Sequence, residues 1–449
     1  MSSQAVESGP PSQISNPVPA AGALDLALQI AGCQLSAGMS ANDVALVALR
    51  ITRAYGLWRV HVDVTYTSIS ASYYPAPGVP PVTCVRIIQP DVIDYSQVRA
   101  LERLSIEIGR GLPLREAATI LDAIRTGRHR YPWWVSMFGN AGVGVGVVLL
   151  FSTSWQVLLI TLMSGCLLDR LLAVLERVRV PPFFSQCAGA AMMTLVAVGA
   201  TAAGRGGVKV LTGVDPTLIV VGGIVMLVAG MTIVGAMQDA IDQFYVTASA
   251  RLLQVTVMTA GIVVGIIAVL ELMRHWGAPA MISPNPVGLG PLGAQFLGVG
   301  VICAGFAVWA YADLATIALA VIMGLLGWAG YTATAAIGAG EVPANAVGAL
   351  TAAFAATLVI RRSSIPSFAL ISAALLPLVP GLSLYNGLLQ LVGTMPGRGD
   401  PAAGAATLFV AVSVALGIAS GATLGTYLGR PIANQLRRIR PWRAKVDDR

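Results

Sequence analysis

Charged residues are scarce in this chain: they make up 11% of its 449 residues, whereas hydrophobic residues make up 56%. A globular protein of this size carries roughly a quarter of its residues as charges. The chain therefore has too little charge to cover itself with a water-compatible surface, and it must lie largely in lipid.

Cysteine patterns that would indicate a disulfide framework or a metal site are also missing. The five cysteines are scattered without a C-x-x-C pair, and three of them lie in apolar runs, where cysteine is usually a small buried hydrophobe. We expect no disulfide framework, no metal site and no cofactor. Residues 1–23 are rich in Pro and Ser and have neither a basic start nor an apolar run, so they predict a disordered tail and no signal peptide.

The net charge of +7 does not indicate nucleic-acid binding, because of where the basic residues lie. A basic cluster fills residues 430–449, directly after an apolar run. At that place it favours a cytoplasmic tail beside anionic lipid headgroups. We therefore expect the lipid bilayer as a partner, and no nucleic acid.

Residues 24–130 are the stretch that reads as a water-soluble domain, of the α+β class. Alternation of apolar and polar residues from Trp58 to Thr67 predicts a half-buried strand, and a second strand is expected at Val82–Gln89. Helical patterns surround them at Leu24–Gly38, Asn42–Tyr55 (capped by Ser40), Ser96–Arg110 and Pro113–Arg125.

From Trp133 onward the sequence consists of apolar runs near the ~20 residues that a membrane-spanning helix needs. We predict ten spans in two halves, residues 131–275 and 276–429. The runs are Trp133–Phe151, Trp155–Leu175, Phe183–Ala203, Leu218–Met237, Leu252–Leu270, Leu292–Ala310, Leu314–Tyr331, Val342–Ile360, Ser367–Val392 and Ala406–Leu428.

Arginine and lysine beside the spans predict their orientation, because cytoplasmic loops carry an excess of these residues. Arg125, Arg128 and Arg130 precede the first span, and further arginines on that side lead to the basic tail. Both termini are therefore expected in the cytoplasm.

The two predicted halves share short fragments. Leu227-Val228-Ala229-Gly230 in the fourth span resembles Leu378-Val379-Pro380-Gly381 in the ninth, and Gly144–Val147 followed by Trp155 resembles Gly298–Val301 followed by Trp309. Because each half has an odd number of spans, the second half would enter the membrane from the opposite side. Such inverted repeats are a recurring architecture of secondary transporters.

The same comparison predicts a substrate site near the membrane midplane. Paired spans that Gly or Pro interrupts free backbone groups there for a solute. The candidate residues lie at those interruptions or follow them at once: Gly230, Thr232, Pro380, Gly381, Ser383, Tyr385 and Asn386. The alternative is a kinked helix that serves packing alone, since Gly and Pro are common in spanning helices.

Charges within or beside spans are costly and hence candidates for ion coupling or gating. Asp239 and Asp242 end the fourth span beside Gln238, Arg251 opens the fifth, and Asp313 lies between the sixth and seventh. No predicted span contains a histidine, so proton coupling would use carboxylates. The alternative is that these residues are ordinary interfacial charges.

Several of these segments resemble the threonine/serine exporter (ThrE) family. The similar motifs are Gly230-Met231-Thr232 through Gln238-Asp239 to Thr247–Arg251, Pro377–Gly387, and in the N-terminal domain Leu35–Gly38, Ala54–Leu57 and His61–Val64. The resemblance covers nearly the whole chain from Leu24. One departure is Gly38-Met39-Ser40-Ala41-Asn42, where many relatives carry a Glu-Thr pair.

The resemblance implies a secondary transporter of the bacterial plasma membrane, a proton antiporter that exports threonine and serine. A membrane enzyme is a further alternative, and the lack of a catalytic constellation in the sequence counts against it. Family relatives linked to succinate-like dicarboxylates leave a dicarboxylate exporter open, although the spans offer almost no basic groups to an anion. A membrane sensor or receptor with a signalling cytoplasmic domain is the alternative from another class. A homo-oligomer is compatible with the sequence.

Overall fold

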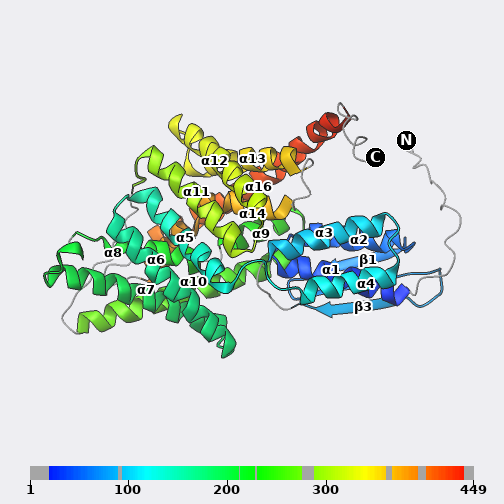
Figure 1. Cartoon of the computed structure of the whole chain (residues 1–449), viewed down its shortest axis with the longest axis horizontal. Coiled ribbons are helices and arrows are strands. Elements are labelled where there is room, and N and C mark those ends of the chain that lie inside the picture. Colours follow the sequence, from blue (N-terminus) through cyan, green and yellow to red (C-terminus); the bar gives the residue numbers. More distant parts are fainter. Residues whose placement is uncertain are drawn as a thin grey trace, which may run out of the picture.

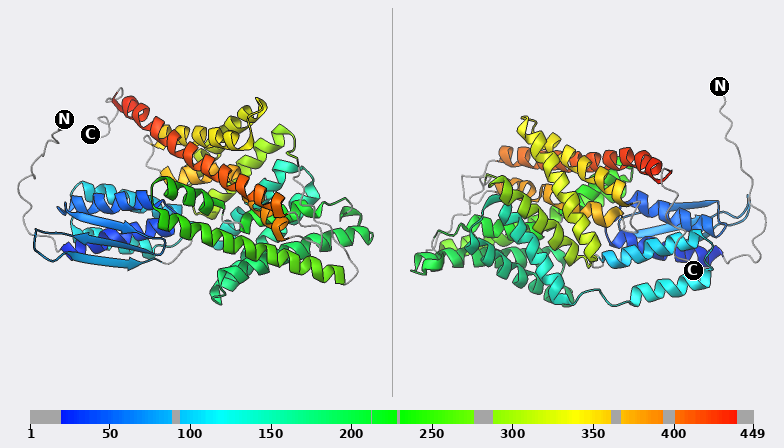
Figure 2. Two further views of the ribbon diagram at one scale, coloured as in Figure 1. Left: turned by 180° about the vertical axis from the view of Figure 1, so that it is seen from behind. Right: turned by 45° about the horizontal axis from the view of Figure 1, so that its top comes forward.

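The computed structural model describes residues 20–88, 94–211, 213–227, 230–275, 288–360, 367–392 and 401–438. Two parts are visible in Figure 1: an N-terminal unit of short helices and strands, residues 20–126, and a bundle of long helices from residue 133 onward. The N-terminal unit lies at one end of the bundle, and the C-terminal end of α16 points to that same end in all views (Figures 1 and 2).

The N-terminal unit has three layers. An antiparallel sheet in the order β1-β2-β3 packs on α1 and α2, which in turn pack on α3 and α4. In this sheet Val62 of β1 is paired with Ala71 of β2, and Ala71 is paired with Cys84 of β3. The elements are α1 Ala20–Ser36, α2 Ala41–Ala54, β1 Val60–Val64, β2 Ser68–Tyr73, β3 Val82–Ile87, α3 Tyr95–Gly109 and α4 Leu114–Thr126.

Local capping explains where these helices begin. The predicted cap of α2 is confirmed, because the Ser40 hydroxyl accepts the Asp43 backbone N–H at 3.2 Å. Asp94 caps α3 in the same way, accepting the N–H of Ser96 at 2.8 Å. The helix α1 begins at Ala20, so the expectation of a disordered tail through residue 23 is wrong for its last four residues, and residues 1–19 lie outside the described part.

The bundle consists of apolar helices with two shorter, interrupted elements. Its members are α5 Trp133–Phe151, α6 Trp155–Arg177, α7 Pro182–Arg205, η1 Lys209–Leu211, α8 Pro216–Leu227, α9 Gly230–Ile241, α10 Tyr245–His275, α11 Leu292–Trp309, α12 Leu314–Ala336, α13 Glu341–Ile360, α14 Ser367–Leu375, η2 Leu376–Leu378, α15 Gly381–Val392 and α16 Pro401–Arg438. His275 ends α10.

Within the described ranges, eight helices are long and apolar enough to cross a membrane, and the bent pair α8–α9 makes a ninth. The helix axis bends by 46° between the two parts of that pair. The run predicted as the ninth span, Ser367–Val392, is divided into α14, η2 and α15. The chain is therefore an α-helical polytopic membrane protein, with interruptions in the two runs where the sequence predicts them.

The helices before and after residue 276 have matching neighbours. In the first set α5 packs on α6 and α8, α7 packs on α6, α8 and α10, α6 also packs on α8, and α9 packs on α10. The helices of the second set correspond to these in order: α11 to α5, α12 to α6, α13 to α7, α14 to α8, α15 to α9 and α16 to α10. Each contact named for the first set has its counterpart between the corresponding helices of the second set. Across the sets, α9 packs on α16 and α10 packs on α15.

The two sets meet along α5 and α11, where glycines allow the backbones to touch. A Cβ on Gly146 would lie 2.7 Å from the carbonyl oxygen of Gly298, and a Cβ on Gly298 would lie 2.6 Å from that of Gly146. Gly139 and Gly305 are paired in the same reciprocal way, at 2.8 and 2.6 Å. Residue numbers rise along one helix as they fall along the other, so α5 and α11 run antiparallel.

One fragment match of the sequence analysis is out of register. Trp155 begins α6, whereas Trp309 ends α11, so these tryptophans do not hold equivalent places. The other fragment is in register, because Gly230 begins α9 and Gly381 begins α15. Short Gly-Val repeats recur by chance in apolar helices, whereas a break in a helix marks a position in the fold.

We expect Gly298→Val to destabilise the bundle by about 3 kcal/mol. A Cβ at this position would lie 2.6 Å from the carbonyl oxygen of Gly146, which leaves no room for a side chain. Gly293→Val on the same helix is the matched control, since nothing lies within 4 Å of its Cβ. Thermal unfolding of the detergent-purified variants measures the difference. Equal melting temperatures for the two would contradict this packing.

Candidate functional site

The last turn of α9 carries a buried carboxylate that reaches into the N-terminal unit. Asp239 is 0% exposed, and its Oδ1 accepts the backbone N–H of Ala41 at 2.9 Å. Ala41 is the first residue of α2, so the carboxylate lies at the N-terminus of that helix, where unsatisfied N–H groups and the helix dipole favour a negative charge.

Arg251 completes this contact from the first turns of α10. Its Nη1 lies 3.1 Å from Oδ2 of Asp239, and its Nη2 donates to the carbonyl of Met39 at 2.9 Å. The side chain of Arg251 is only 4% exposed. Gly235 gives it room, since a Cβ there would lie 2.7 Å from Nη1. A buried ion pair of this kind is costly to break, because the remaining charge is left without a counter-ion.

Three further polar contacts surround the pair. Asp242 hydrogen-bonds with Asn42, and burial raises the pKa of the Asp242 carboxyl, an effect that this bond opposes and the nearby Asp43 carboxylate reinforces. The Thr247 hydroxyl donates to the carbonyl of Val64 at 3.1 Å, and the Tyr66 hydroxyl donates to the side chain of Gln254. We call this contact of residues 39–42 and 64–66 with residues 239–254 the first anchor.

A second contact joins the N-terminal unit to the helices after residue 276. The Tyr95 backbone N–H donates to the carbonyl of Ala310 at 2.8 Å, and its side chain, 3% exposed, lies edge-on to Phe306 and Phe368. Arg99 forms an ion pair with Asp313 at 2.9 Å. We call this contact of Tyr95 and Arg99 with residues 306–313 and Phe368 the second anchor.

Asp313 is a charged partner in this anchor. Burial alone would raise its pKa, but hydrogen bonds from Thr316 and Arg99 outweigh that effect and hold the pKa of the Asp313 carboxyl below its usual value. It therefore stays ionised at neutral pH, which suits an electrostatic contact better than proton transfer. The segment after α4 adds to the contact, since the Tyr131 hydroxyl donates to the carbonyl of Ala312 at 2.9 Å.

The predicted substrate residues lie apart from both anchors, at the interruptions of the bundle. Thr232 is in the first turn of α9, and Ser383 and Asn386 are in the first two turns of α15, all three half-buried. Pro380 and Gly381 form the break itself: the Gly381 N–H bonds to the carbonyl of Val379 at 2.8 Å, and α15 starts there. Gly230 begins α9, but its surroundings and the side chain of Tyr385 lie outside the described part.

The structure thus divides the predicted site residues into three places. Asp239 and Arg251 are in contact, and Asp242 is near them. Gln238 is half-buried at the end of α9, where its carbonyl accepts the Asp242 N–H at 3.0 Å. Asp313 belongs to the second anchor.

Sequence reasoning missed the residues of the N-terminal unit that receive these charges. Met39 and Ala41 lie in the Gly38–Asn42 segment, which the sequence analysis noted only as a departure from the family pattern. They contribute backbone groups, which carry no signature in the sequence. Arg99 has a visible signal, an arginine one turn into a predicted helix, but nothing in the sequence connects it with Asp313.

Glu102 is a further titratable group between α2 and α3. The pKa of the Glu102 carboxyl is raised to about 7. Burial is the largest cause of this rise, the Arg50 guanidinium opposes it, and the Asp43 carboxylate adds to it. Asp43 is in turn close enough to Asp239 and Asp242 to raise the energy of their negative charges. Glu102 and the two carboxylates of the first anchor therefore share Asp43 as a charged neighbour.

Glu102→Gln is expected to flatten the pH dependence of stability. Because the pKa of Glu102 is about 7 in the folded protein against an ordinary 4.5, the unfolded chain ionises first, and stability falls as pH rises from about 4.5 to 7. The glutamine variant lacks this loss, so its advantage over wild type should grow between pH 5 and pH 8 by on the order of 2–3 kcal/mol. Urea unfolding at several pH values measures it, with exposed Glu107→Gln as control; parallel pH profiles would contradict the shift.

Comparisons with known proteins match two family models along the chain. The family described as "Putative threonine/serine exporter" matches residues 25–273, and the family "Threonine/Serine exporter, ThrE" matches residues 295–427. The two matches cover the N-terminal unit with α5 to α10, and α11 to most of α16. No solved structure matches the chain.

Two relatives match over most of their length. The chain is 32% identical over 422 residues to a "Probable threonine/serine exporter" of Mycobacterium tuberculosis, covering 91% of this chain and 77% of that protein. It is 31% identical over 434 residues to a "Threonine/serine exporter" of Corynebacterium glutamicum, covering 94% and 86%. On this evidence the chain belongs to the threonine/serine exporter (ThrE) family.

Proposed function

We propose that the protein exports threonine and serine across the plasma membrane as a secondary transporter that exchanges them for protons. The observation that carries the proposal is the pair of interrupted helices, α8–α9 and α14–η2–α15, at corresponding places in two sets of helices with matching neighbours. Secondary transporters bind their substrates at such paired interruptions.

The proposed architecture has ten crossings in two inverted halves, with α14, η2 and α15 together as the ninth. The antiparallel contact of α5 with α11 supports it, because the reciprocal glycine pairs are what a two-fold axis in the membrane plane would produce. The reciprocal contacts of α9 with α16 and α10 with α15 support the same axis.

The N-termini of α9 and α15 would bind the substrate. Each begins at a glycine within an apolar run, so unsatisfied N–H groups and a partial positive charge are available to the carboxylate of an amino acid. Thr232, Ser383 and Asn386 offer side chains for the ammonium and hydroxyl groups, and we assign Gly230, Pro380, Gly381 and Tyr385 to the same site from their positions in the sequence.

We place the N-terminal unit in the cytoplasm. It lies at the same end of the bundle as the C-terminal end of α16, from which the basic tail continues (Figure 2). Arg128 and Arg130 lie at that end, just before α5. Arg170 and Arg177 lie in the second half of α6, which runs back toward the same end. This agrees with the excess of basic residues in cytoplasmic loops.

The two anchors then have a role in gating. One joins the N-terminal unit to the first set of helices and the other joins it to the second set, both at the cytoplasmic end. Because alternating access moves one half relative to the other, one anchor must yield during the cycle. Protonation of Asp239 would remove the charge that pairs with Arg251, which connects proton binding with release of the first anchor.

Release of threonine from loaded cells tests the proposed substrate. Cells that carry the protein are loaded with threonine or serine from dipeptides that contain them, or with succinate from its ester. The amount of each solute that appears outside is compared with that from cells that carry the empty vector. Faster release of threonine and serine, with succinate unchanged, is the expected result. Succinate release alone would replace the substrate by a dicarboxylate, and unchanged release of all three would favour a sensor.

A further inference from the structure

Residues 127–132 link α4 to α5, and His129 holds the middle of this linker. The ring Nδ1 of His129 lies 2.8 Å from Oδ2 of Asp94, the residue that caps α3. The same ring is stacked on the side chain of Tyr311, in the turn between α11 and α12, with 4.6 Å between the ring centroids and 20° between the ring planes. His129 therefore connects the linker with both the N-terminal unit and the second set of helices.

Both partners of His129 are buried and held in place by other contacts. The side chain of Asp94 is 2% exposed, and its Oδ1 accepts the backbone N–H groups of Ser96 at 2.8 Å and Gln97 at 3.1 Å. Tyr311 is 8% exposed and has a φ of 57°, a left-handed conformation that non-glycine residues rarely adopt and that persists only where the surrounding structure imposes it. The rest of the fold thus fixes the positions to which the His129 ring binds.

The His129 side chain itself is 49% exposed, so protons from the solvent can reach it. Histidine is the side chain that ordinarily changes its charge between pH 5 and pH 8. A neutral ring makes an ordinary hydrogen bond with Asp94, whereas a protonated ring makes an ion pair with it and places a cation against the Tyr311 ring. Charge-assisted hydrogen bonds are roughly twice as strong as neutral ones, and a cation is attracted to an aromatic face. Protonation therefore strengthens both contacts of His129.

Other charged groups lie around the His129 ring on a shared cavity or on the linker itself. They come from β3, α4 and the linker: Arg86, Asp122, Arg125, Arg128 and Arg130. The two cavity arginines have partners away from the ring, since Arg86 pairs with Asp25 at 3.8 Å and Arg125 donates to the side chain of Gln29 at 3.3 Å. The buried carboxylate of the α3 cap is thus the charge that His129 contacts directly.

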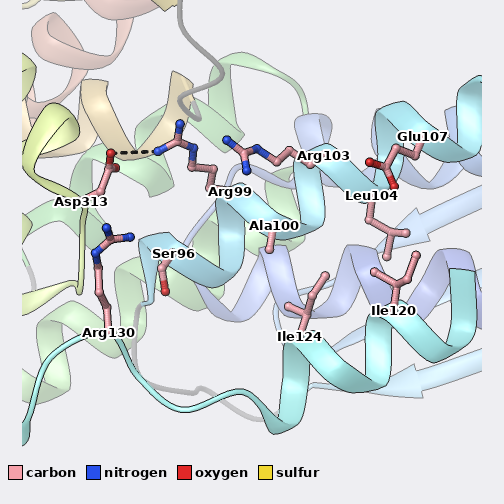
Figure 3. Close-up of a pocket in the computed structure, with 10 residues that line it drawn as sticks. All are labelled: Ser96, Arg99, Ala100, Arg103, Leu104, Glu107, Ile120, Ile124, Arg130 and Asp313. Carbon is pink, nitrogen blue, oxygen red and sulfur yellow. Dashed lines mark ion pairs between the residues drawn. The ribbon is translucent and has the colours of Figure 1, made fainter.

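The contacts of His129 adjoin the second anchor. Asp94 and Tyr311 are the sequence neighbours of Tyr95 and Ala310, which the backbone hydrogen bond of that anchor joins. Further along the linker, the guanidinium group of Arg130 lies beside the aspartate of the same anchor (Figure 3). A more tightly held linker therefore opposes opening of the second anchor.

We propose that His129 is a pH-dependent latch of the second anchor, which tightens as the cytoplasm becomes acidic. This role rests on the proposed function, in which an anchor must yield during the cycle and each exported amino acid is exchanged for a proton. Such an exchange brings protons into the cell. A latch that slows the cycle at acidic cytoplasmic pH limits that entry.

Trypsin cleavage of the full-length protein in detergent tests the latch, because Arg128 and Arg130 on either side of His129 are exposed. The rate of linker cleavage is measured at about pH 6 and pH 8 and divided by the rate on a small peptide substrate at the same pH. In the wild type we expect this ratio to be at least threefold lower at pH 6, because the protonated ring is held more strongly. His129→Gln, whose amide can bond to Asp94 without a charge, should give the same ratio at both pH values.

Two further variants separate the charge of the latch from the fold around it. Asp94→Asn keeps a residue that caps helices well and removes the counter-charge, so it should lose most of the pH dependence. His61→Gln changes an exposed histidine of β1 and should keep the full wild-type dependence. A wild-type ratio that is equal at the two pH values would overturn the proposal, and so would a His129→Gln ratio that changes as much as that of the wild type.

Threonine exchange in proteoliposomes, with the same pH on both sides, tests the effect of the latch on transport. We expect His129→Gln to exchange threonine at least threefold faster than wild type at about pH 6, and at the wild-type rate at about pH 8. Equal rates of the two proteins at both pH values would overturn the regulation. Absence of any threonine exchange would contradict the proposed export, whereas the cleavage ratio would still decide whether the latch exists.

Discussion

Asp239→Asn is expected to slow threonine export at least tenfold and to loosen the N-terminal unit. The amide can still accept the N–H of Ala41, but Arg251, only 4% exposed, loses its counter-ion. Removing one partner of a buried ion pair costs about 3–5 kcal/mol. We therefore expect at least a tenfold lower export rate, with normal amounts of protein in the membrane. Trypsin cleavage in the linker, at exposed Arg128, should be faster than in wild type.

Asp242→Asn is the matched control, because Asp242 is half-buried three residues further on and hydrogen-bonds with Asn42. It should keep most of the export activity. The double variant Asp239→Asn/Arg251→Met, which removes both charges, should unfold at a higher temperature than Asp239→Asn alone. Wild-type export by Asp239→Asn would remove this residue from coupling and gating.

Tyr95→Ala is expected to release the second anchor. The ring is 3% exposed and lies between Phe306 and Phe368, with its hydroxyl bonded to Ser372, and burial raises the pKa of that hydroxyl. Truncating a buried aromatic side chain costs about 3–5 kcal/mol. The first anchor is unchanged in this variant, so we expect faster linker cleavage and a lower melting temperature, with export reduced or uncoupled from the proton gradient.

Tyr95→Phe keeps the ring and loses only the hydroxyl, so it should cost about 1 kcal/mol. Tyr74→Ala removes a tyrosine of the same unit that is 41% exposed, and it should behave like wild type. Should Tyr95→Ala leave both linker cleavage and export unchanged, the second anchor would have no role in the transport cycle.

Most of the helices could be predicted from the sequence, because membrane helices are long and strongly apolar and the four helices of the N-terminal unit have regular apolar faces. The strand β2 was not predicted. Its sequence, Ser68-Ile69-Ser70-Ala71-Ser72-Tyr73, alternates between serine and small or moderate apolar residues, and its burial comes from its central place in the sheet. The strand predicted at residues 58–67 is correspondingly too long, since β1 ends at Val64.

Asp239 and Arg251 were predicted as candidate residues because charges near the membrane are costly, but the contact between them was not predicted. The partners of this pair in the N-terminal unit could not be predicted, because Ala41 is 198 residues away from Asp239 and contributes only its backbone N–H. The interruptions at Gly230 and Gly381 were predictable from paired Gly and Pro, whereas the roles of Thr232, Ser383 and Asn386 stay predictions.

Efflux from proteoliposomes made with the purified protein tests the central proposal most directly. Vesicles preloaded with radiolabelled threonine are diluted into buffer at the internal pH or about two units more acidic, with and without a protonophore. We predict threonine efflux that the acidic exterior accelerates at least severalfold and that the protonophore slows to the rate without a gradient. Correctly inserted protein that releases neither threonine nor serine under any of these conditions would contradict export as the function of this protein.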